Sequence, residues 1–270
     1  MNILVTLNSN YITPLKVMLK SLFFNNWRER FSIYIMQSSL TDRELQQIED
    51  IVINQGHEFH VISIKDEYFK DAPVVMHYSK EMYYRLLAFK FMPPKIDKLL
   101  YLDPDILIIN GIRELYNTDL TGYLYAAAYH HRGSINKINK IRLKPYDIEA
   151  YYNSGVLLFN LNQQRNTIDE KDIFDFVREN ADTLILPDQD ILNALYSKSI
   201  KPVDEILYNY DPRYYNYYKI ISNGKYDMNY IIYNTSIIHF CGKQKPWKKN
   251  YSGKFHSLYK HYERIALEQS

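Results

Sequence analysis

The stretch KLLYLDPDILII, residues 98–109, places two carboxylates, Asp103 and Asp105, inside an apolar run. A buried charge without a partner is costly, so a chain needs a reason to keep two of them there. Residues 97–102 are typical of a buried strand, and side chains two apart on an extended segment face the same side. Pro104 lacks the N–H that a sheet ladder uses, so we expect the segment to leave the sheet there. Both carboxylates are therefore predicted at the carboxyl end of a strand, where open α/β sheets bind ligands.

Apolar strands alternate with amphipathic helices around this stretch. One helix has the start signal of a capping box, Thr41 with Glu44, and Gly56 as its stop. Another is expected to begin at Thr13 as N-cap, with Pro14 in its first position. The alternation predicts an α/β fold with a mainly parallel central sheet and helices on both faces. Strands are expected at 2–7, 31–36, 58–64, 97–102, 123–128, 153–160 and 236–240, and helices at 12–26, 41–56, 79–92, 172–180, 188–198 and 255–268.

Composition narrows the class of protein. The chain has 270 residues, 46% of them hydrophobic, which suits one large domain with a small annex. Its net charge of +2 gives no electrostatic reason to expect a nucleic-acid partner. The single cysteine, Cys241, excludes an intramolecular disulfide and is typical of a reducing compartment. The first residues do not resemble a signal peptide, and no apolar run has the length of a membrane span, so we expect a cytoplasmic protein.

Two converging carboxylates repel each other unless a cation or a proton lies between them. A divalent metal is the simplest solution, and carboxylate oxygens suit Mg²⁺ or Mn²⁺. The alternative is an ordinary turn in which an aspartate caps and Pro104 fixes the backbone. The Asp-x-Asp pattern alone leaves both interpretations open.

A second group of polar residues follows the apolar strand at 236–240. His239 ends that strand, and a basic loop with Gly242, Lys243 and Lys245 comes next. An imidazole beside two carboxylates favours Mn²⁺ over Mg²⁺, and lysines neutralise phosphate. A structural histidine followed by a solvated basic surface is the alternative. A metal site with a basic loop is what a nucleoside-diphosphate leaving group requires.

Six segments of the chain form a recognisable set. In chain order they are LVTLNSNYITPLKVMLKSL, YYRLLAFKFMP, KLLYLDPDILI, YYNSGVLLFNL, LPDQDILN and HFCGKQKPW. Together they resemble glycosyltransferase family 8, the retaining hexosyltransferases that include lipopolysaccharide galactosyl- and glucosyltransferases and glycogenin. The resemblance implies a GT-A fold with a Rossmann-like nucleotide-binding half, a UDP-sugar donor and a bound Mn²⁺, with Mg²⁺ as the alternative metal. It implies transfer of glucose or galactose to a glycan or glycolipid acceptor.

The resemblance also assigns roles to residues. Asp103, Asp105 and His239 would bind the metal. Asp188 and Gln189 would lie beside the anomeric carbon as the catalytic residues. The substrate-binding residues would be Asn8, Asn10 and Tyr11 for uracil and ribose, Arg85, Asn153 and Ser154 for the donor sugar, and Gly242 and Lys245 for the diphosphate.

The sequence departs from the family at the donor sugar. Galactosyltransferases of the family carry a carboxylate after the strand at 123–128, whereas this chain has Tyr129 and His130, which favours glucose. Retention of configuration needs either a carboxylate nucleophile or attack by the acceptor on the face that the leaving group departs from. We favour same-face attack, with Gln189 stabilising positive charge at the anomeric carbon, and double displacement through Asp188 stays open.

Two other functions compete with sugar transfer. Asp-x-Asp phosphohydrolases use the first aspartate as nucleophile, but Leu107 stands where they carry threonine or valine. A carbohydrate-binding module would account for the tyrosines at 208–219. In a sugar transferase these tyrosines would either form a wall of the acceptor cleft or pack a surface loop against the core, and the sequence leaves both open. Binding of UDP with Mn²⁺ separates these alternatives.

The last part of the chain is expected to be distinct. We predict a catalytic domain at 1–247 and a basic, aromatic helical appendage at 248–270. Residues 243–264 contain seven lysines and arginines but one acidic residue, Glu263, and aromatic residues lie between the basic ones. This composition predicts either a helix packed on the domain or a weak, salt-sensitive membrane contact that brings a lipid-linked acceptor within reach.

Overall fold

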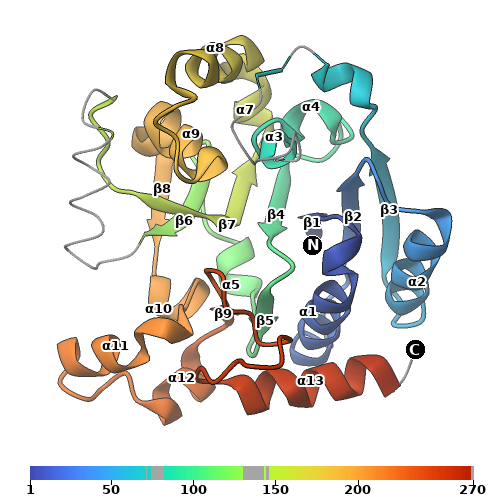
Figure 1. Cartoon of the computed structure of the whole chain (residues 1–270), viewed down its shortest axis with the longest axis vertical. Helices are drawn as coiled ribbons and strands as arrows, with labels where there is room; N and C mark the ends of the chain where they lie inside the picture. The colour runs from blue at the N-terminus through green and yellow to red at the C-terminus, as the bar shows by residue number, and fades with distance from the viewer. Residues whose placement is uncertain (71, 74–81, 130–142, 144–145, 269–270) are drawn as a thin grey trace.

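The computed structural model describes residues 1–70, 72–73, 82–129, 143 and 146–268 (Figure 1). A seven-stranded sheet in the order β3-β2-β1-β4-β7-β6-β8 lies at its centre, with a second sheet of two strands, β5 and β9. The strands are β1 (Asn2–Thr6), β2 (Ser32–Gln37), β3 (Glu58–Ser63), β4 (Lys98–Leu102), β5 (Ile106–Ile108), β6 (Tyr125–Tyr129), β7 (Tyr152–Asn160), β8 (Ile200–Val203) and β9 (Ile237–His239).

Helices surround the central sheet and fill the far end of the molecule (Figure 1). The α-helices are α1 (Ile12–Asn25), α2 (Asp42–Ile53), α3 (Met82–Leu86), α4 (Ala88–Phe91), α5 (Arg113–Tyr116), α7 (Leu161–Thr167), α8 (Glu170–Asn180), α9 (Pro187–Tyr196), α10 (Glu205–Tyr208), α11 (Tyr215–Ile221), α12 (Met228–Asn234) and α13 (His256–Glu268). The 3-10 helices are η1 (Ser9–Tyr11), η2 (Asp66–Phe69), η4 (Ser197–Ser199) and η5 (Pro212–Tyr214).

The central sheet is mixed but mainly parallel, as predicted. Strands β1, β2, β3 and β4 pair in parallel, and β6 pairs in parallel with β8. Strand β7 runs antiparallel to both β4 and β6. Strand β4 is therefore the central strand, and its carboxyl end is the point where the chain carries its two aspartates.

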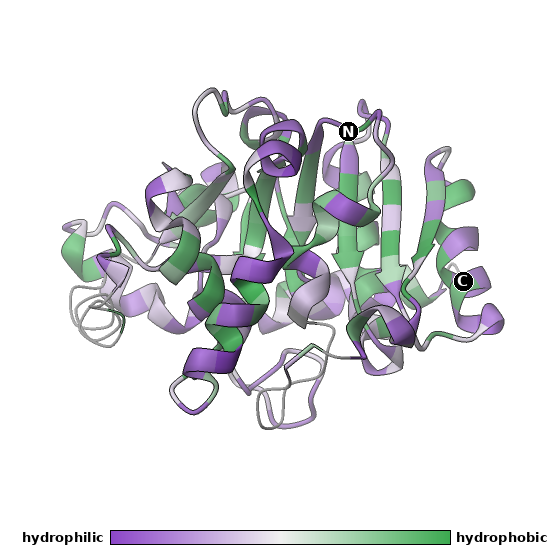
Figure 2. Ribbon diagram, turned by 90° about the horizontal axis from the view of Figure 1, so that it is seen from above, coloured by the Kyte–Doolittle hydropathy of each residue, from purple (hydrophilic) through white to green (hydrophobic). Residues whose placement is uncertain are grey.

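Each face of the sheet has its own hydrophobic core, which explains the continuous apolar strands. On β1, Leu4 faces one core with helices α3, α4, α8 and α9, whereas Ile3 and Val5 face the other core with α1 and α2. Figure 2 shows the strands mostly hydrophobic and several of the surrounding helices partly hydrophilic. The predicted cover of helices on both faces is confirmed.

Helix α1 begins differently from its prediction. The expected N-cap, Thr13, is wrong, because η1 runs directly into α1 and Tyr11 holds the N-cap position without a side-chain hydrogen bond. Asn8 caps η1 by accepting from the Asn10 N–H, so the turn starts earlier. Pro14 lies within the first turn, where its missing N–H costs nothing. The capping box of α2, by contrast, is present, since the Thr41 hydroxyl accepts from the Glu44 N–H and the Glu44 carboxylate accepts from the Thr41 N–H.

The helix expected at 79–92 is two short helices. Residues 79–81 lie outside the described residues, and Leu87 interrupts the rest between α3 and α4 with φ of −108° and ψ of 13°. The segment is also less amphipathic than predicted, since Tyr83, Tyr84 and Phe89 are all buried. Its packing on several sides overrides the helical periodicity. Lys90 is exposed, whereas Arg85 is partly buried and its side chain reaches the candidate site.

The C-terminal helix packs along α1 (Figure 1). Tyr259 and Tyr262 are buried in a third hydrophobic core with Val17, and the Asn25 amide donates to the Tyr262 hydroxyl at 2.8 Å. The aromatic rings of this helix are therefore largely used inside the protein. In the part of the chain that the structure describes, no helix combines the length and the apolar character needed to cross a membrane.

Candidate active site

The backbone itself brings the three expected metal ligands together. The Asp103 N–H still donates to the Gly155 carbonyl at 2.8 Å, and the chain then leaves the central sheet at Pro104 as predicted. It enters β5, which pairs antiparallel with β9 so that Ile106 lies opposite His239. Asp105 is thus one residue from the partner of His239, although the two are far apart in sequence.

The ligand atoms of these residues form one compact group. The His239 Nε2 lies 3.2 Å from Asp105 Oδ1 and 3.8 Å from Asp103 Oδ2. One ligand atom from each of the three residues lies within 4.8 Å of the others. Asp105 and His239 are buried, and the Asp103 side chain is 20% exposed. The arrangement leaves one side of the group open to solvent.

The orientation of the His239 ring is fixed by Asn209. The Asn209 Oδ1 atom lies 2.8 Å from His239 Nδ1, and because a carbonyl oxygen only accepts, Nδ1 carries the proton. In the neutral imidazole, Nε2 then presents a lone pair toward the two carboxylates. Sequence reasoning missed Asn209, which lies in the tyrosine-rich segment and carries no motif of its own.

The residues present suit a divalent cation. Asp105 Oδ1 is a buried carboxylate oxygen without a hydrogen-bond donor among the described residues. Gly155 leaves room at the same point, since a Cβ there would overlap the His239 ring and lie 2.6 Å from Asp103 Oδ2. The absence of a side chain at Gly155 lets His239 and Asp103 approach each other, and converging acceptors of this kind are what a metal site requires.

Two cations accompany the carboxylates. Lys245 Nζ donates to Asp105 Oδ2 and, at 2.9 Å, to the Phe240 carbonyl. Arg85 Nη1 lies 3.1 Å from Asp103 Oδ1 and 3.0 Å from Asp188 Oδ2. When His239 is neutral, the site holds three carboxylates and two cations, so its net charge is −1. A bound divalent cation would change this net charge to +1.

The electrostatic surroundings shift the pKa values of the two aspartates in opposite directions. Burial raises the pKa of the Asp103 carboxyl, and the Arg85 guanidinium opposes that shift. Burial acts in the same direction on Asp105, but the His239 imidazole and the Lys245 ammonium outweigh it and hold the pKa of Asp105 well below its usual range. Burial lowers the pKa of His239, whereas Cys241 and Asp105 raise it, and the net pKa is well above the ordinary value.

A polar network extends the site from Asp103 to helix α9. The Ser154 hydroxyl donates to Asp188 Oδ2 at 2.9 Å, and Arg85 Nη1 donates to the Ser154 carbonyl at 3.2 Å. Gln189 Oε1 accepts from Asn153 Nδ2 at 3.3 Å and from the Ser154 N–H at 3.4 Å. The structure thus brings five predicted site residues together beside the metal-ligand group: Arg85, Asn153, Ser154, Asp188 and Gln189.

Two buried residues hold α9 in this position. Asn193 accepts from the Tyr152 N–H at 2.6 Å and donates to the Tyr152 carbonyl at 2.8 Å, which joins α9 to the start of β7. Asp190 accepts from the Tyr151 hydroxyl and from the Ile185 N–H. The DQDILN segment therefore supplies two residues that face the site and two that anchor the helix.

Tyr101 also supports the site and was missed. Its hydroxyl donates to Asp103 Oδ1 at 2.5 Å, and its ring lies under the Arg85 guanidinium at 4.6 Å. Both contacts restrict the conformation of the charged side chains. A tyrosine two residues before the first aspartate on the same strand shares its face, and that spacing could have revealed it.

The expected nucleotide-binding residues lie at the end of β1. Asn8 is the N-cap of η1, and Asn10 and the partly exposed Tyr11 lie within η1. The Tyr11 ring meets the edge of Trp247 at 5.9 Å, and Lys245 Nζ lies 5.9 Å from the centre of the Trp247 ring. The basic loop after β9 therefore joins the metal-ligand group to the N-terminal turn.

The other residues that the sequence singled out for the donor sugar, the diphosphate and the acceptor lie in different segments of the chain. Gly242 has φ of +83° and lies against the Arg213 guanidinium. Tyr129 ends β6 with its ring 5.5 Å from that of Tyr152, whereas His130 lies outside the described residues. In the tyrosine-rich segment Tyr218 is buried, and Tyr214, Tyr215 and Tyr217 are partly exposed.

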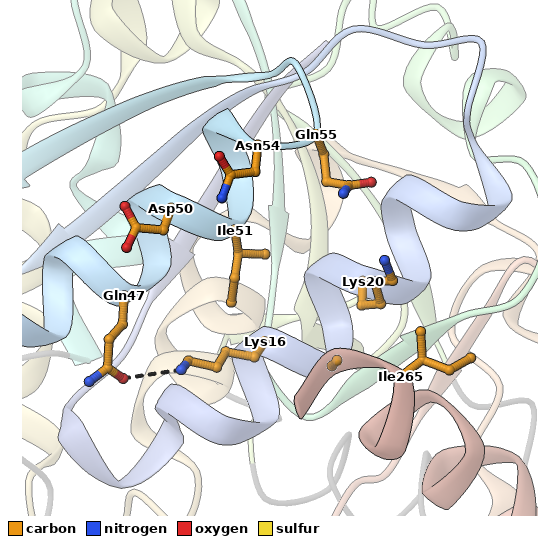
Figure 3. Close-up of a pocket in the computed structure, with 9 residues that line it drawn as sticks. Lys16, Lys20, Gln47, Asp50, Ile51, Asn54, Gln55 and Ile265 are labelled. Carbon is orange, nitrogen blue, oxygen red and sulfur yellow. Dashed lines mark hydrogen bonds between the residues drawn. The ribbon is translucent and has the colours of Figure 1, made fainter. Parts of the chain in front are cut away.

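A cavity of about 230 Å³ lies elsewhere, between α1, α2 and α13 (Figure 3). Lys16 and Ile265 line it from two sides, and Lys16 Nζ donates to Gln47 Oε1 at 3.1 Å. None of its lining residues belongs to the candidate site. It is a gap where the C-terminal helix meets the N-terminal helices.

Comparison with a solved structure identifies the fold. The galactosyltransferase LgtC, in a crystal structure with donor and acceptor sugar analogues, superposes with a TM-score of 0.81 at 22% identity, covering 98% of this chain and 96% of that one. The mixed sheet and its helices thus match a GT-A fold.

Sequence comparisons identify the family. The family model "Glycosyl transferase family 8" matches residues 2–251. General stress protein A of Bacillus subtilis (strain 168) is 26% identical over 275 residues, covering 97% of this chain and 92% of that protein. Lipopolysaccharide 1,2-glucosyltransferase of Escherichia coli (strain K12) is 27% identical over 276 residues, covering 100% of this chain and 78% of that protein. The chain belongs to glycosyltransferase family 8, which favours sugar transfer over the phosphohydrolase and binding-module alternatives.

Replacing Asn209 tests the support of the histidine. Asn209→Ala removes the acceptor for the Nδ1 proton, so we expect the affinity for a divalent cation to fall about 10- to 100-fold. Asn209→Asp keeps an acceptor and should retain most of the affinity. Titration with Mn²⁺ measures both, and the melting temperature of each variant separates lost binding from lost folding. Asn234→Ala, at an exposed helix end, is the control. Equal affinity in Asn209→Ala and the wild type would contradict this role.

Proposed function

We propose that the protein is a retaining hexosyltransferase that transfers a hexose from a UDP-sugar to a glycan or glycolipid acceptor with Mn²⁺ as cofactor. The observation that carries the proposal is the group formed by Asp103, Asp105 and His239, with Lys245 beside it, at the end of the central strand. Two comparisons support it. A relative is named as a lipopolysaccharide glucosyltransferase, and LgtC was crystallised with donor and acceptor sugar analogues.

Asp103, Asp105 and His239 would hold the metal. When bound, the metal would act as a Lewis acid on diphosphate oxygens. A nitrogen ligand beside two carboxylates supports Mn²⁺ over Mg²⁺, which prefers oxygen ligands. The Lys245 ammonium, which donates to Asp105, would stabilise the negative charge that develops on the leaving group.

The contacts of Asp188 support same-face attack. Its Oδ2 atom is held by Arg85 and by the Ser154 hydroxyl, and a carboxylate so neutralised is a weak nucleophile. In same-face attack the anomeric carbon loses its bond to the diphosphate oxygen and gains a bond to the acceptor oxygen, and the acceptor proton passes to the diphosphate. Gln189 is held by Asn153 and Ser154, and its carbonyl dipole would stabilise positive charge on the sugar ring.

We propose glucose as the donor sugar. Tyr129 stands after the apolar part of β6, where the galactosyltransferases of the resemblance carry a carboxylate. A tyrosine offers one hydroxyl there instead of a charged pair of oxygens. The glucosyltransferase relative supports the same choice.

Two measurements test the proposal together. Calorimetry is expected to show UDP binding at least tenfold tighter with Mn²⁺ than without it, because the metal shares the charge of the diphosphate with the two aspartates. Without an acceptor, UDP-glucose should be hydrolysed slowly, and an NMR time course should show the α anomer first. An initial β product would exclude retention, and the absence of binding by any uridine nucleotide would refute the proposed donor.

A further inference from the structure

The guanidinium of Arg213 is held in a fixed position beside the basic loop. Its Nε donates to Asp211 Oδ2 at 2.9 Å and its Nη2 donates to the same oxygen at 2.5 Å, and Asp211 is completely buried. The remaining nitrogen, Nη1, lies against Gly242, where a Cβ would overlap it. The side chain is still 44% exposed. One edge of the planar group is thus used by Asp211, and the side chain as a whole stays partly exposed beside Gly242.

Two tyrosines and a second cation extend this surface. The Arg213 Cζ lies 5.3 Å from the centre of the Tyr214 ring, and Lys254 Nζ lies 5.2 Å from the centre of the Tyr215 ring. Phe255 packs against Tyr215 with ring centres 6.5 Å apart, which brings the segment before α13 against η5 and α11. We call Arg213, Tyr214, Tyr215, Lys243 and Lys254 the basic rim.

The loop after β9 carries more positive charge than the donor needs. From His239 to Tyr262 there are six lysines and no acidic residue. Lys245 pairs with Asp105 and Lys260 with Glu263. Among the described residues, no carboxylate lies within ion-pair distance of the other four, which are exposed: Lys243, Lys248, Lys249 and Lys254. A divalent cation neutralises the diphosphate of a nucleotide sugar, so these lysines point to a second anion.

The rim adjoins the expected diphosphate residue Gly242 and continues from there onto η5 and α11. The later part of the loop contacts the metal-ligand group through Lys245 and the N-terminal turn through Trp247. The earlier part, at Gly242, contacts η5 through Arg213. Tyrosine rings can stack on the apolar faces of sugars while cations beside them bind phosphate or carboxylate.

We propose that the basic rim binds the acceptor and that the acceptor is an anionic glycan, one that bears phosphate or carboxylate groups. This inference rests on the proposed function. An anionic membrane is the competing partner for a basic surface, but Phe255, Tyr259 and Tyr262 of the same segment are buried and cannot insert between lipids.

Binding of defined oligosaccharides tests the rim with UDP and Mn²⁺ already bound. The probes are an oligogalacturonate, a phosphorylated mannan oligosaccharide and the neutral maltohexaose. We expect at least one anionic probe to bind about tenfold or more tighter than the neutral one. The double variant Lys243→Gln, Lys254→Gln should remove most of that preference. Lys225→Gln is the matched control, because Lys225 also lies over tyrosine rings but outside the rim.

Arg213 gives a second, stronger test. Arg213→Ala should lower the affinity for the anionic probe about tenfold, more than it lowers the affinity for UDP. The melting temperature of this variant must be followed, since it leaves the buried Asp211 without a partner. The lysine variants do not touch Asp211, so they decide the question if Arg213→Ala does not fold.

Each contrary outcome has a distinct meaning. If UDP with Mn²⁺ does not bind, the proposed function fails. If UDP binds but the anionic and neutral probes bind equally, only the basic rim proposal fails. Equal losses of UDP and probe affinity in Arg213→Ala would assign Arg213 to the donor diphosphate. Binding to phosphatidylglycerol vesicles, but to neither anionic oligosaccharide, would assign the rim to a membrane surface and overturn the proposal.

Discussion

Replacing Asp105 by asparagine is expected to lower sugar transfer by about 10²- to 10³-fold, and Asp103→Asn should have an effect of similar size. Each change keeps the shape of the side chain but removes a negative charge that faces His239. An amide binds a divalent cation much more weakly than a carboxylate does. The leaving diphosphate would then lose most of its charge stabilisation.

The two variants are expected to differ in stability. Asp105 neutralises the partly buried Lys245, so Asp105→Asn should lower the melting temperature. Arg85 keeps its ion pair with Asp188 when Asp103 is neutralised, so Asp103→Asn should melt closer to the wild type. The control is Asp182→Asn, which changes the same charge at an exposed turn.

Transfer assays and Mn²⁺ titrations on these three variants decide the role of the carboxylates. Loss of metal binding and of activity in the two site variants, with neither loss in Asp182→Asn, is the expected pattern. Full activity of Asp103→Asn and Asp105→Asn in the presence of a chelator would show that metal ligation is not their function.

The sheet and its two cores follow from local patterns. Apolar strands alternating with helices predict a covered, mainly parallel sheet, and the period of two along KLLYLDPD predicts two carboxylates on one side. The capping box at Thr41 is equally local, because both of its hydrogen bonds span three residues. Such features depend on neighbours along the chain, so the sequence shows them directly.

The supports of the site depend instead on contacts between distant segments. Asn209 and His239 are 30 residues apart, and Arg85 reaches the Ser154 carbonyl across 69 residues. Nothing in the residues before β9 predicts that it pairs with β5 rather than with the central sheet. The resemblance to family 8 supplied Arg85 and Ser154, but Asn209 carries no motif that distinguishes it from other asparagines.

Glycine at a strand interior is a signal that sequence reasoning could have used. A glycine there lacks a side chain to pack and often marks a close approach by another group. Gly155 lies in β7, next to the predicted residue Ser154, and its φ is not in the left-handed region. Gly155 is therefore needed because it has no side chain, since His239 and Asp103 occupy the position that its Cβ would take.

Gly155→Ala is accordingly expected to reduce metal binding and transfer about as strongly as loss of a carboxylate, by about 10²-fold or more. The added methyl would overlap the His239 ring and lie 2.6 Å from Asp103 Oδ2, so one of the two ligands must move. The Gly155 carbonyl accepts from the Asp103 N–H at 2.8 Å, so a shift of the Gly155 backbone would itself displace the segment that carries Asp103. Displacement of the ligands by even an ångström is enough to weaken a metal site.

Gly111→Ala provides the matched control for this variant. It adds the same methyl where the nearest atom, Asn26 Oδ1, is 3.8 Å away, so neither activity nor stability should change much. Mn²⁺ titration, transfer rate and melting temperature are measured on both variants. A Gly155→Ala protein that melts near the wild type but binds Mn²⁺ weakly would locate the effect in the ligands, because a general packing defect would lower the melting temperature first. Normal Mn²⁺ affinity in Gly155→Ala would mean that the cation binds elsewhere, since no arrangement of Asp103 and His239 seen in this structure accommodates the methyl group.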